Sequence, residues 1–160
     1  MSERTIQGLG RPAELLMVED NYGDVLLARK AFRTAKIANN LSVASDGEQA
    51  MDMLRQLGTY DRQPRPDLIL LDLNLPRMDG REVLQAIKAD PNLQPIPVIV
   101  LTSSSAHTDI IKSYALNANG YIVKPVNFDR LKEIVASLES FWFSIVVLPG
   151  PPSVDDASAF

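Results

Sequence analysis

Asp67-Leu-Ile-Leu-Leu-Asp-Leu-Asn-Leu-Pro-Arg-Met-Asp-Gly80 is the segment that decides the fold of this chain. Its apolar run, residues 68–71, lies between Pro66 and Pro76 and is followed by the carboxylate of Asp72. Such a run is too short for a helix and is typical of a strand buried on both faces of a parallel sheet. Ligands of open parallel sheets bind beyond the carboxyl ends of the strands. Asp72 is therefore a candidate functional residue. The alternative is that Asp72 only caps a loop.

Four other segments, residues 15–18, 41–44, 98–101 and 121–123, also have the length and apolar content of strands. Amphipathic patterns with helical spacing separate the segments, so strand and helix alternate five times along the chain. This alternation predicts a doubly wound α/β fold, in which helices cover both faces of a parallel sheet through right-handed crossovers. The segment at 41–44 alternates and is less apolar, which indicates an edge strand.

Capping residues predict where the helices begin. Asn21 or Asp20 is expected to cap the first helix, and Asn127 the last one. The segment Ser45-Asp-Gly-Glu48 has the pattern of a capping box. A further helix is expected at about residues 108–117.

Composition limits the classes of protein that the chain can be. Its 160 residues suit one domain, which we expect at residues 13–148, between a flexible lead at 1–12 and a disordered tail at 149–160. The absence of cysteine excludes disulfides and thiol catalysis. A net charge of -4 argues against nucleic-acid binding. Since no apolar run reaches the ~18 residues of a membrane span, we expect no membrane association and a cytoplasmic location.

Polar side chains follow the buried strands in a definite order: Glu19 and Asp20, then Asp72, then Thr102, then Lys124. In a parallel sheet these side chains share one edge. Two carboxylates ~5 Å apart repel by ~3 kcal/mol at an effective dielectric of 20, so they must bind a cation, take up a proton or move apart. Mg²⁺ suits one or two carboxylates together with phosphate oxygens. A carboxylate beside such an ion, facing a lysine and a hydroxyl, can accept a phosphoryl group.

Each of these residues also has an ordinary interpretation. Glu19 and Asp20 suit the start of a helix, Thr102 suits the end of a strand, and Lys124 suits a solvated surface. Their occurrence together, in this order, favours the phosphoryl-transfer site. The single histidine, His107, is interpreted as a surface or capping residue.

These motifs resemble those of the response-regulator receiver domains of two-component signalling, over about residues 13–143. The resemblance implies the flavodoxin-like strand order 2-1-3-4-5 and phosphorylation of Asp72. It implies that Mg²⁺ is held by Glu19, Asp20, Asp72 and the main-chain carbonyl of Asn74. It also implies that Thr102 and Tyr121 are switch residues, and that Lys124 precedes Pro125 through a cis peptide bond. Ser103 and Ser104 depart from the residues that the family commonly has after the switch threonine.

By this resemblance, a histidine kinase donates the phosphoryl group in a phosphorelay, and the chain catalyses only its own phosphorylation and dephosphorylation. Thr102 then moves toward the phosphoryl group and Tyr121 turns inward. These movements would bias the surface made by the fourth helix, fifth strand and fifth helix.

The apolar segment at 139–148 follows a complete domain pattern. This segment, together with Leu71-Asp-Leu-Asn-Leu-Pro76 and Gly80-Arg-Glu-Val-Leu84, resembles the single-domain regulators that partner bacterial and cyanobacterial phytochrome kinases. The resemblance implies a homodimer formed through the fourth helix, fifth strand and fifth helix. Apolar and aromatic enrichment of this kind is typical of an interface, although the segment can equally pack back on its own domain. The expected interface residues are Phe141, Trp142, Phe143, Ile145 and Val147.

Three other classes of protein are weighed against this one. An aspartyl-phosphate phosphatase usually needs a second acid two residues after the nucleophile, where this chain has Asn74. A dinucleotide-binding domain needs a glycine-rich turn, and none follows Val18. A receiver-like interaction module that is never phosphorylated remains an open alternative. A DNA-binding output is not expected, because no second domain pattern follows.

Overall fold

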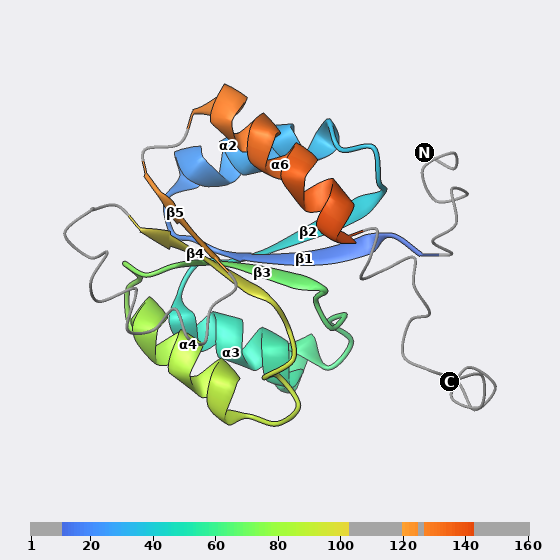
Figure 1. Cartoon of the computed structure of the whole chain (residues 1–160). Helices are drawn as coiled ribbons and strands as arrows, with labels where there is room; N and C mark the ends of the chain where they lie inside the picture. The colour runs from blue at the N-terminus through green and yellow to red at the C-terminus, as the bar shows by residue number, and fades with distance from the viewer. Residues whose placement is uncertain (1–10, 103–119, 125–126, 143–160) are drawn as a thin grey trace.

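The structure is a computed structural model that describes residues 11–102, 120–124 and 127–142, with only the backbone at Thr102, Phe141 and Trp142 (Figure 1). The predicted helix at 108–117 and the predicted tail lie outside the described residues, as do residues 1–10 of the predicted lead. The described elements are β1 Ala13–Val18, α2 Tyr22–Arg33, β2 Asn39–Ala44, α3 Gly47–Arg55, the 3₁₀ turn η1 Gly58–Tyr60, β3 Leu68–Asp72, α4 Gly80–Ala89, β4 Val98–Thr102, β5 Gly120–Val123 and α6 Phe128–Trp142.

The strands form one parallel sheet in the order β2-β1-β3-β4-β5, which confirms the predicted fold and strand order. β2 lies at an edge, as its alternating sequence predicted. Figure 1 shows α2 and α6 on one face of the sheet and α3 and α4 on the other. β3 therefore lies in the middle of the sheet between two layers of helices, and Asp72, its last residue, lies where the carboxyl ends of the strands meet.

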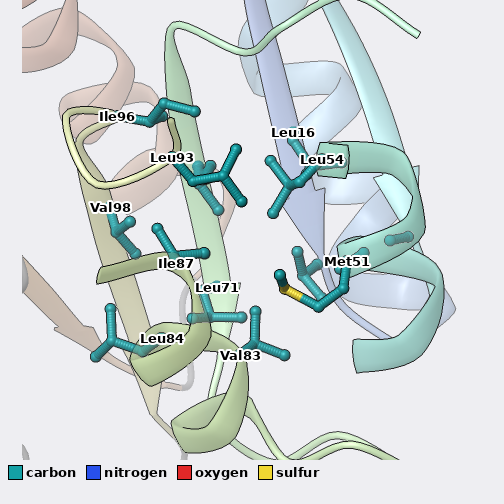
Figure 2. Close-up of a cluster of buried hydrophobic side chains, with 14 of the residues drawn as sticks. Leu16, Met51, Leu54, Leu71, Val83, Leu84, Ile87, Leu93, Ile96 and Val98 are labelled. Atoms are coloured by element: carbon teal, nitrogen blue, oxygen red, sulfur yellow. The ribbon is translucent and has the colours of Figure 1, made fainter. Parts of the chain in front are cut away.

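The residues of β3 alternate between two separate cores, which explains why its apolar run is unbroken. Ile69 and Leu71 pack with α3 and α4, and Leu68 and Leu70 pack with α2 and α6. Every residue of β3 is buried. Figure 2 shows Leu71 of the first cluster beside side chains of α3 and α4. Both faces of β3 are thus held by apolar packing, and this packing fixes where Asp72 lies.

The helix caps agree with the sequence at two of three predicted positions. Asn21 Oδ1 accepts a hydrogen bond from the Asp24 amide at 2.9 Å, and Asn127 Oδ1 accepts one from the Arg130 amide at 2.8 Å. The capping box predicted from Ser45 is wrong by one residue, because Asp46 caps α3 and accepts from the Gln49 amide at 2.7 Å.

A capping box that was not predicted lies at the start of α4. The Asp79 side chain accepts from the Arg81 amide, and the Glu82 side chain accepts from the Asp79 amide at 3.0 Å. This box satisfies free amides of the first turn of α4. It places the start of α4 directly after the loop that follows Asp72.

The entry of the chain into the sheet is fixed by an ion pair. The Arg11 guanidinium donates to both carboxylate oxygens of Asp67, at 2.7 and 2.9 Å. Asp67 also accepts from the Glu14 amide at 2.8 Å, so it joins the starts of β1 and β3. Within the described parts of the chain, no helix combines the length and apolar character that crossing a bilayer requires.

Candidate functional site

Acidic side chains from two neighbouring strands meet at the carboxyl edge of the sheet. Glu19 and Asp20 follow β1, and Asp72 ends β3. One carboxylate oxygen from each of the three lies within 4.8 Å of the others. Glu19 and Asp72 are only 1% and 3% exposed, whereas Asp20 is exposed to solvent. The parallel register of β1 and β3 thus brings together the acids that the sequence predicted to share one edge.

Backbone amides orient two of these carboxylates. The Asn74 amide donates to Asp72 Oδ1 at 3.1 Å, and the Asn21 amide donates to Glu19 Oε2 at 3.2 Å. The Glu19 amide in turn donates to the Ala44 carbonyl at 2.9 Å. Both side chains are therefore held by the loops that follow their own strands, and neither can rotate without losing a hydrogen bond.

The Lys124 ammonium connects three carboxylates. Its Nζ atom lies 2.7 Å from Glu19 Oε1, 3.0 Å from Asp24 Oδ2 and 3.5 Å from Asp72 Oδ2. The Lys124 side chain is 15% exposed. The sequence predicted that Lys124 would face Glu19 and Asp72, but it did not predict the contact with Asp24. The only signal in the sequence is that Asp24 lies about one helical turn after Asp20, in the first turn of α2.

The pKa values of Glu19 and Lys124 are each set by burial and by neighbouring charges, which act against each other. Burial raises the pKa of Glu19 to about 7; the hydrogen bond from Lys124 opposes the rise, and the nearby Asp72 charge adds to it. Burial lowers the pKa of Lys124, but hydrogen bonds to Glu19 and Asp24, with the charges of Asp72 and Glu19, outweigh burial and raise it above its ordinary value. Lys124 is therefore charged at neutral pH, while Glu19 titrates near neutrality.

Glu19 is expected to make the stability of the cation-free protein fall as pH rises. Its carboxyl has an ordinary pKa of 4.5 and a pKa of about 7 in the folded protein. Between these two pKa values, the folded state binds more protons than the unfolded state, and proton binding therefore stabilises the fold. This stabilisation is complete below the ordinary pKa of Glu19 and is lost as the pH rises through its pKa in the folded protein. Unfolding by urea in the presence of a chelator measures the effect. The wild-type protein should lose a few kcal/mol relative to Glu19→Gln between about pH 5 and about pH 8. A difference that does not change with pH would contradict this assignment.

The acids fit a divalent cation by the chemistry of their donor atoms. Carboxylate oxygens are the ligands that hard divalent cations prefer, and those of Glu19, Asp20 and Asp72 are close enough to share one ion. Asn74 lies in the loop directly after Asp72, to which its amide is bonded. The role predicted for the Asn74 carbonyl stays a prediction.

The remaining predicted residues are placed only in part. Tyr121 lies in β5, pairs in register with Val100 and is 41% exposed, so it is not part of the buried core. Thr102 ends β4 beside Val123 of β5, and only its backbone is described. Four other predicted features lie outside the described residues: the Pro125 bond, Ser103, Ser104 and His107. The predicted interface is outside them too at Phe143, Ile145 and Val147, and Phe141 and Trp142 are described only as backbone of α6.

The fold and these strand-end residues define a class of protein. The chain belongs to the response regulator receiver domain family, whose model matches residues 15–136.

Individual relatives narrow the comparison. The response regulator Rcp1 of Synechocystis sp. is 47% identical over 138 residues, which are 86% of this chain and 94% of that protein. The crystal structure of the Mn²⁺-bound form of Rcp1 covers 87% of this chain and 100% of its own, with a TM-score of 0.75. The phosphorylated cyanobacterial phytochrome response regulator RcpA is 46% identical, also has a TM-score of 0.75, and covers 84% of this chain and 96% of its own. This chain is therefore similar to response regulators of phytochromes over nearly their whole length.

Proposed function

We propose that this chain is a response regulator in which Asp72 accepts a phosphoryl group from the phosphohistidine of a histidine kinase. One observation carries the proposal: Asp72, at the end of β3, is buried 3.5 Å from Lys124 and shares its edge of the sheet with Glu19 and Asp20. Carboxylates at strand ends that face a fixed ammonium suit phosphoryl transfer, in which a negatively charged phosphoryl group moves from a donor to an acceptor.

In this transfer, a lone pair of Asp72 Oδ forms a bond to phosphorus while the phosphorus–nitrogen bond of phosphohistidine breaks. The electron pair of that bond returns to the imidazole nitrogen of the kinase. Lys124 offsets charge on the phosphoryl oxygens, because its pKa is raised and it is charged throughout the neutral range. The Asn74 amide holds Asp72 Oδ1, so Oδ2, which faces Lys124, is the oxygen that this geometry favours as the nucleophile.

We assign the cation to Glu19, Asp20 and Asp72, with Asn74 beside them, and propose Mg²⁺ as the ion. Mg²⁺ would supply positive charge for the phosphoryl oxygens. The Mn²⁺-bound form of Rcp1 supports a divalent cation in a relative of this chain.

Phosphorylation would add about one further negative charge at Asp72, together with new acceptor oxygens. We propose that Thr102 and Tyr121 respond to this charge. The exposed Tyr121 ring has an outward position from which to turn. The predicted output surface includes β5 and α6. We further propose that the protein forms a homodimer through this surface. The interface would include Phe141, Trp142, Phe143, Ile145 and Val147.

We infer that the donor kinase is a phytochrome, since the phytochrome response regulator RcpA is similar to 84% of this chain. The proposal is tested with a phytochrome histidine kinase that has been autophosphorylated with labelled ATP and freed of nucleotide. Mixing it with this chain and Mg²⁺ should move the label to the wild-type chain and not to Asp72→Asn.

The control variant is Asp79→Asn, in the same loop. Asparagine caps helices about as well as aspartate, so this variant should accept label at the wild-type rate. Transfer to Asp72→Asn would remove Asp72 as the acceptor. A transfer rate no faster than that from an unrelated chemotaxis kinase would remove the phytochrome partnership.

A further inference from the structure

Asp24 holds Lys124 from outside the acid group at the sheet edge. It lies in the first turn of α2, and its Oδ2 atom is 3.0 Å from Lys124 Nζ. Its amide is bonded to the capping Asn21 side chain, so the backbone that carries it is fixed. The other two carboxylates that Lys124 contacts, Glu19 and Asp72, both belong to the group that could hold a cation.

The carboxylates of Glu19 and Asp72 each have partners within the protein. Glu19 binds Lys124 through Oε1 and the Asn21 amide through Oε2. Asp72 binds the Asn74 amide through Oδ1 and faces Lys124 through Oδ2. A divalent cation needs oxygens of these same residues, and its charge repels the Lys124 ammonium. Lys124 and the cation therefore compete for the same carboxylates.

Asp24 lies outside the acid group, so a cation bound by that group would leave the contact between Asp24 and Lys124 in place. The Asp24 carboxylate, which contacts Lys124 from the side of α2, keeps the ammonium near Asp72. It also gives the ammonium a negatively charged partner when the carboxylates of Glu19 and Asp72 bind a cation. Asp24, Glu19 and Lys124 line one small cavity together with the apolar side chains of Met17, Leu101 and Leu131, so these charged groups lie against an apolar surface.

We propose that Asp24 is a positioning residue for phosphoryl transfer, which acts by holding Lys124 so that a divalent cation and the ammonium can occupy the site together. The inference rests on the proposed function of Asp72. It assigns a role in the chemistry to the first turn of α2, where neither the strand-end pattern nor the acid group places one.

The test is a double-mutant cycle between Asp24→Asn and Lys124→Met, because such a cycle separates an effect that acts through the lysine from one that does not. The first readout is binding of Mg²⁺ alone to the unphosphorylated protein, measured by calorimetry. Asp24→Asn should weaken binding roughly tenfold, as expected when a hydrogen bond between charged groups is lost and Lys124 turns to Glu19 and Asp72. In the Lys124→Met background the same change should weaken binding by about twofold or less.

Two further variants complete the comparison. Asp24→Glu keeps the carboxylate and should restore most of the wild-type affinity. Asp52→Asn removes the same charge from an exposed position on α3 and should leave the affinity unchanged. An equal loss of affinity for Asp24→Asn in both backgrounds would overturn the proposal, because Asp24 would then act through its charge alone.

The second readout is the rate of phosphorylation by acetyl phosphate at saturating Mg²⁺. The rate should fall roughly tenfold in Asp24→Asn and recover in Asp24→Glu. A normal rate in Asp24→Asn would also overturn the proposal. Failure of the wild-type chain to gain any phosphoryl group would instead contradict the proposed function, and the Mg²⁺ cycle would still test the contact between Asp24 and Lys124.

Discussion

Gly80→Ala is expected to destabilise the protein by roughly 4 kcal/mol, because the added methyl group would overlap fixed backbone atoms. A Cβ atom at Gly80 would lie 2.2 Å from the Asp72 carbonyl oxygen and 2.5 Å from the Leu73 Cα atom. The Gly80 amide also donates to the Leu73 carbonyl at 3.2 Å. Relief of the overlap would therefore have to move the start of α4 away from the end of β3. Urea unfolding measures the loss.

Gly58→Ala is the matched control for this substitution. Gly58 has a φ of 57°, and a Cβ atom there would meet nothing within 4 Å. Only the cost of a positive φ is expected, about 1 kcal/mol. If the two variants lost the same free energy of unfolding, the close contact between α4 and the acceptor strand would be contradicted. A larger loss for Gly80→Ala would confirm that α4 approaches the end of β3 too closely for a side chain at position 80.

Lys124→Met is expected to cost about 3 kcal/mol of stability at about pH 8 in the absence of divalent cations, since removing one partner leaves buried charges uncompensated. Glu19 and Asp72 are both almost fully buried and would lose the ammonium that they share. At about pH 6 the loss should be smaller, because Glu19, with its pKa of about 7, is then largely protonated. Added Mg²⁺ should restore stability, since it binds only the folded acid group.

Lys88→Met is the control for the loss of a partly buried lysine. Its ammonium donates to the carbonyls of Gln94 and Ile96, at 3.2 and 3.4 Å, and burial lowers its pKa. We expect a loss of about 1 kcal/mol that differs little between the two pH values and is not restored by Mg²⁺. Wild-type stability of Lys124→Met at about pH 8 would contradict the account of Lys124 as the counter-ion of the acids.

The fold was predictable because its signals are local and periodic. The unbroken apolar run of β3 shows burial on two faces, and the structure divides these residues between two cores. The alternation of strand and helix then predicts a parallel sheet, in which strand-end residues such as Glu19 and Asp72 must share an edge. The strand order came from resemblance to a family, since periodicity does not distinguish one order from another.

The missed features depend on contacts between distant segments. The Asp24–Lys124 ion pair joins α2 to the end of β5 across the sheet edge, and the spacing of Asp24 one helical turn after Asp20 does not by itself indicate a lysine partner. Ser45 and Asp46 can each cap a helix, so sequence alone did not decide between them, and the structure uses Asp46. The need for glycine at position 80 follows only from how closely α4 approaches Asp72 in space.

The central claim, that Asp72 accepts the phosphoryl group, is tested most directly by intact mass after incubation with acetyl phosphate and Mg²⁺. In that reaction Asp72 displaces acetate from phosphorus, so the chain gains one phosphoryl group. The wild-type chain should show this gain, and Asp72→Asn should show none. No gain in a wild-type chain that binds Mg²⁺ would contradict the claim and favour an interaction module that is never phosphorylated. A gain in both proteins would place the phosphoryl group on another residue.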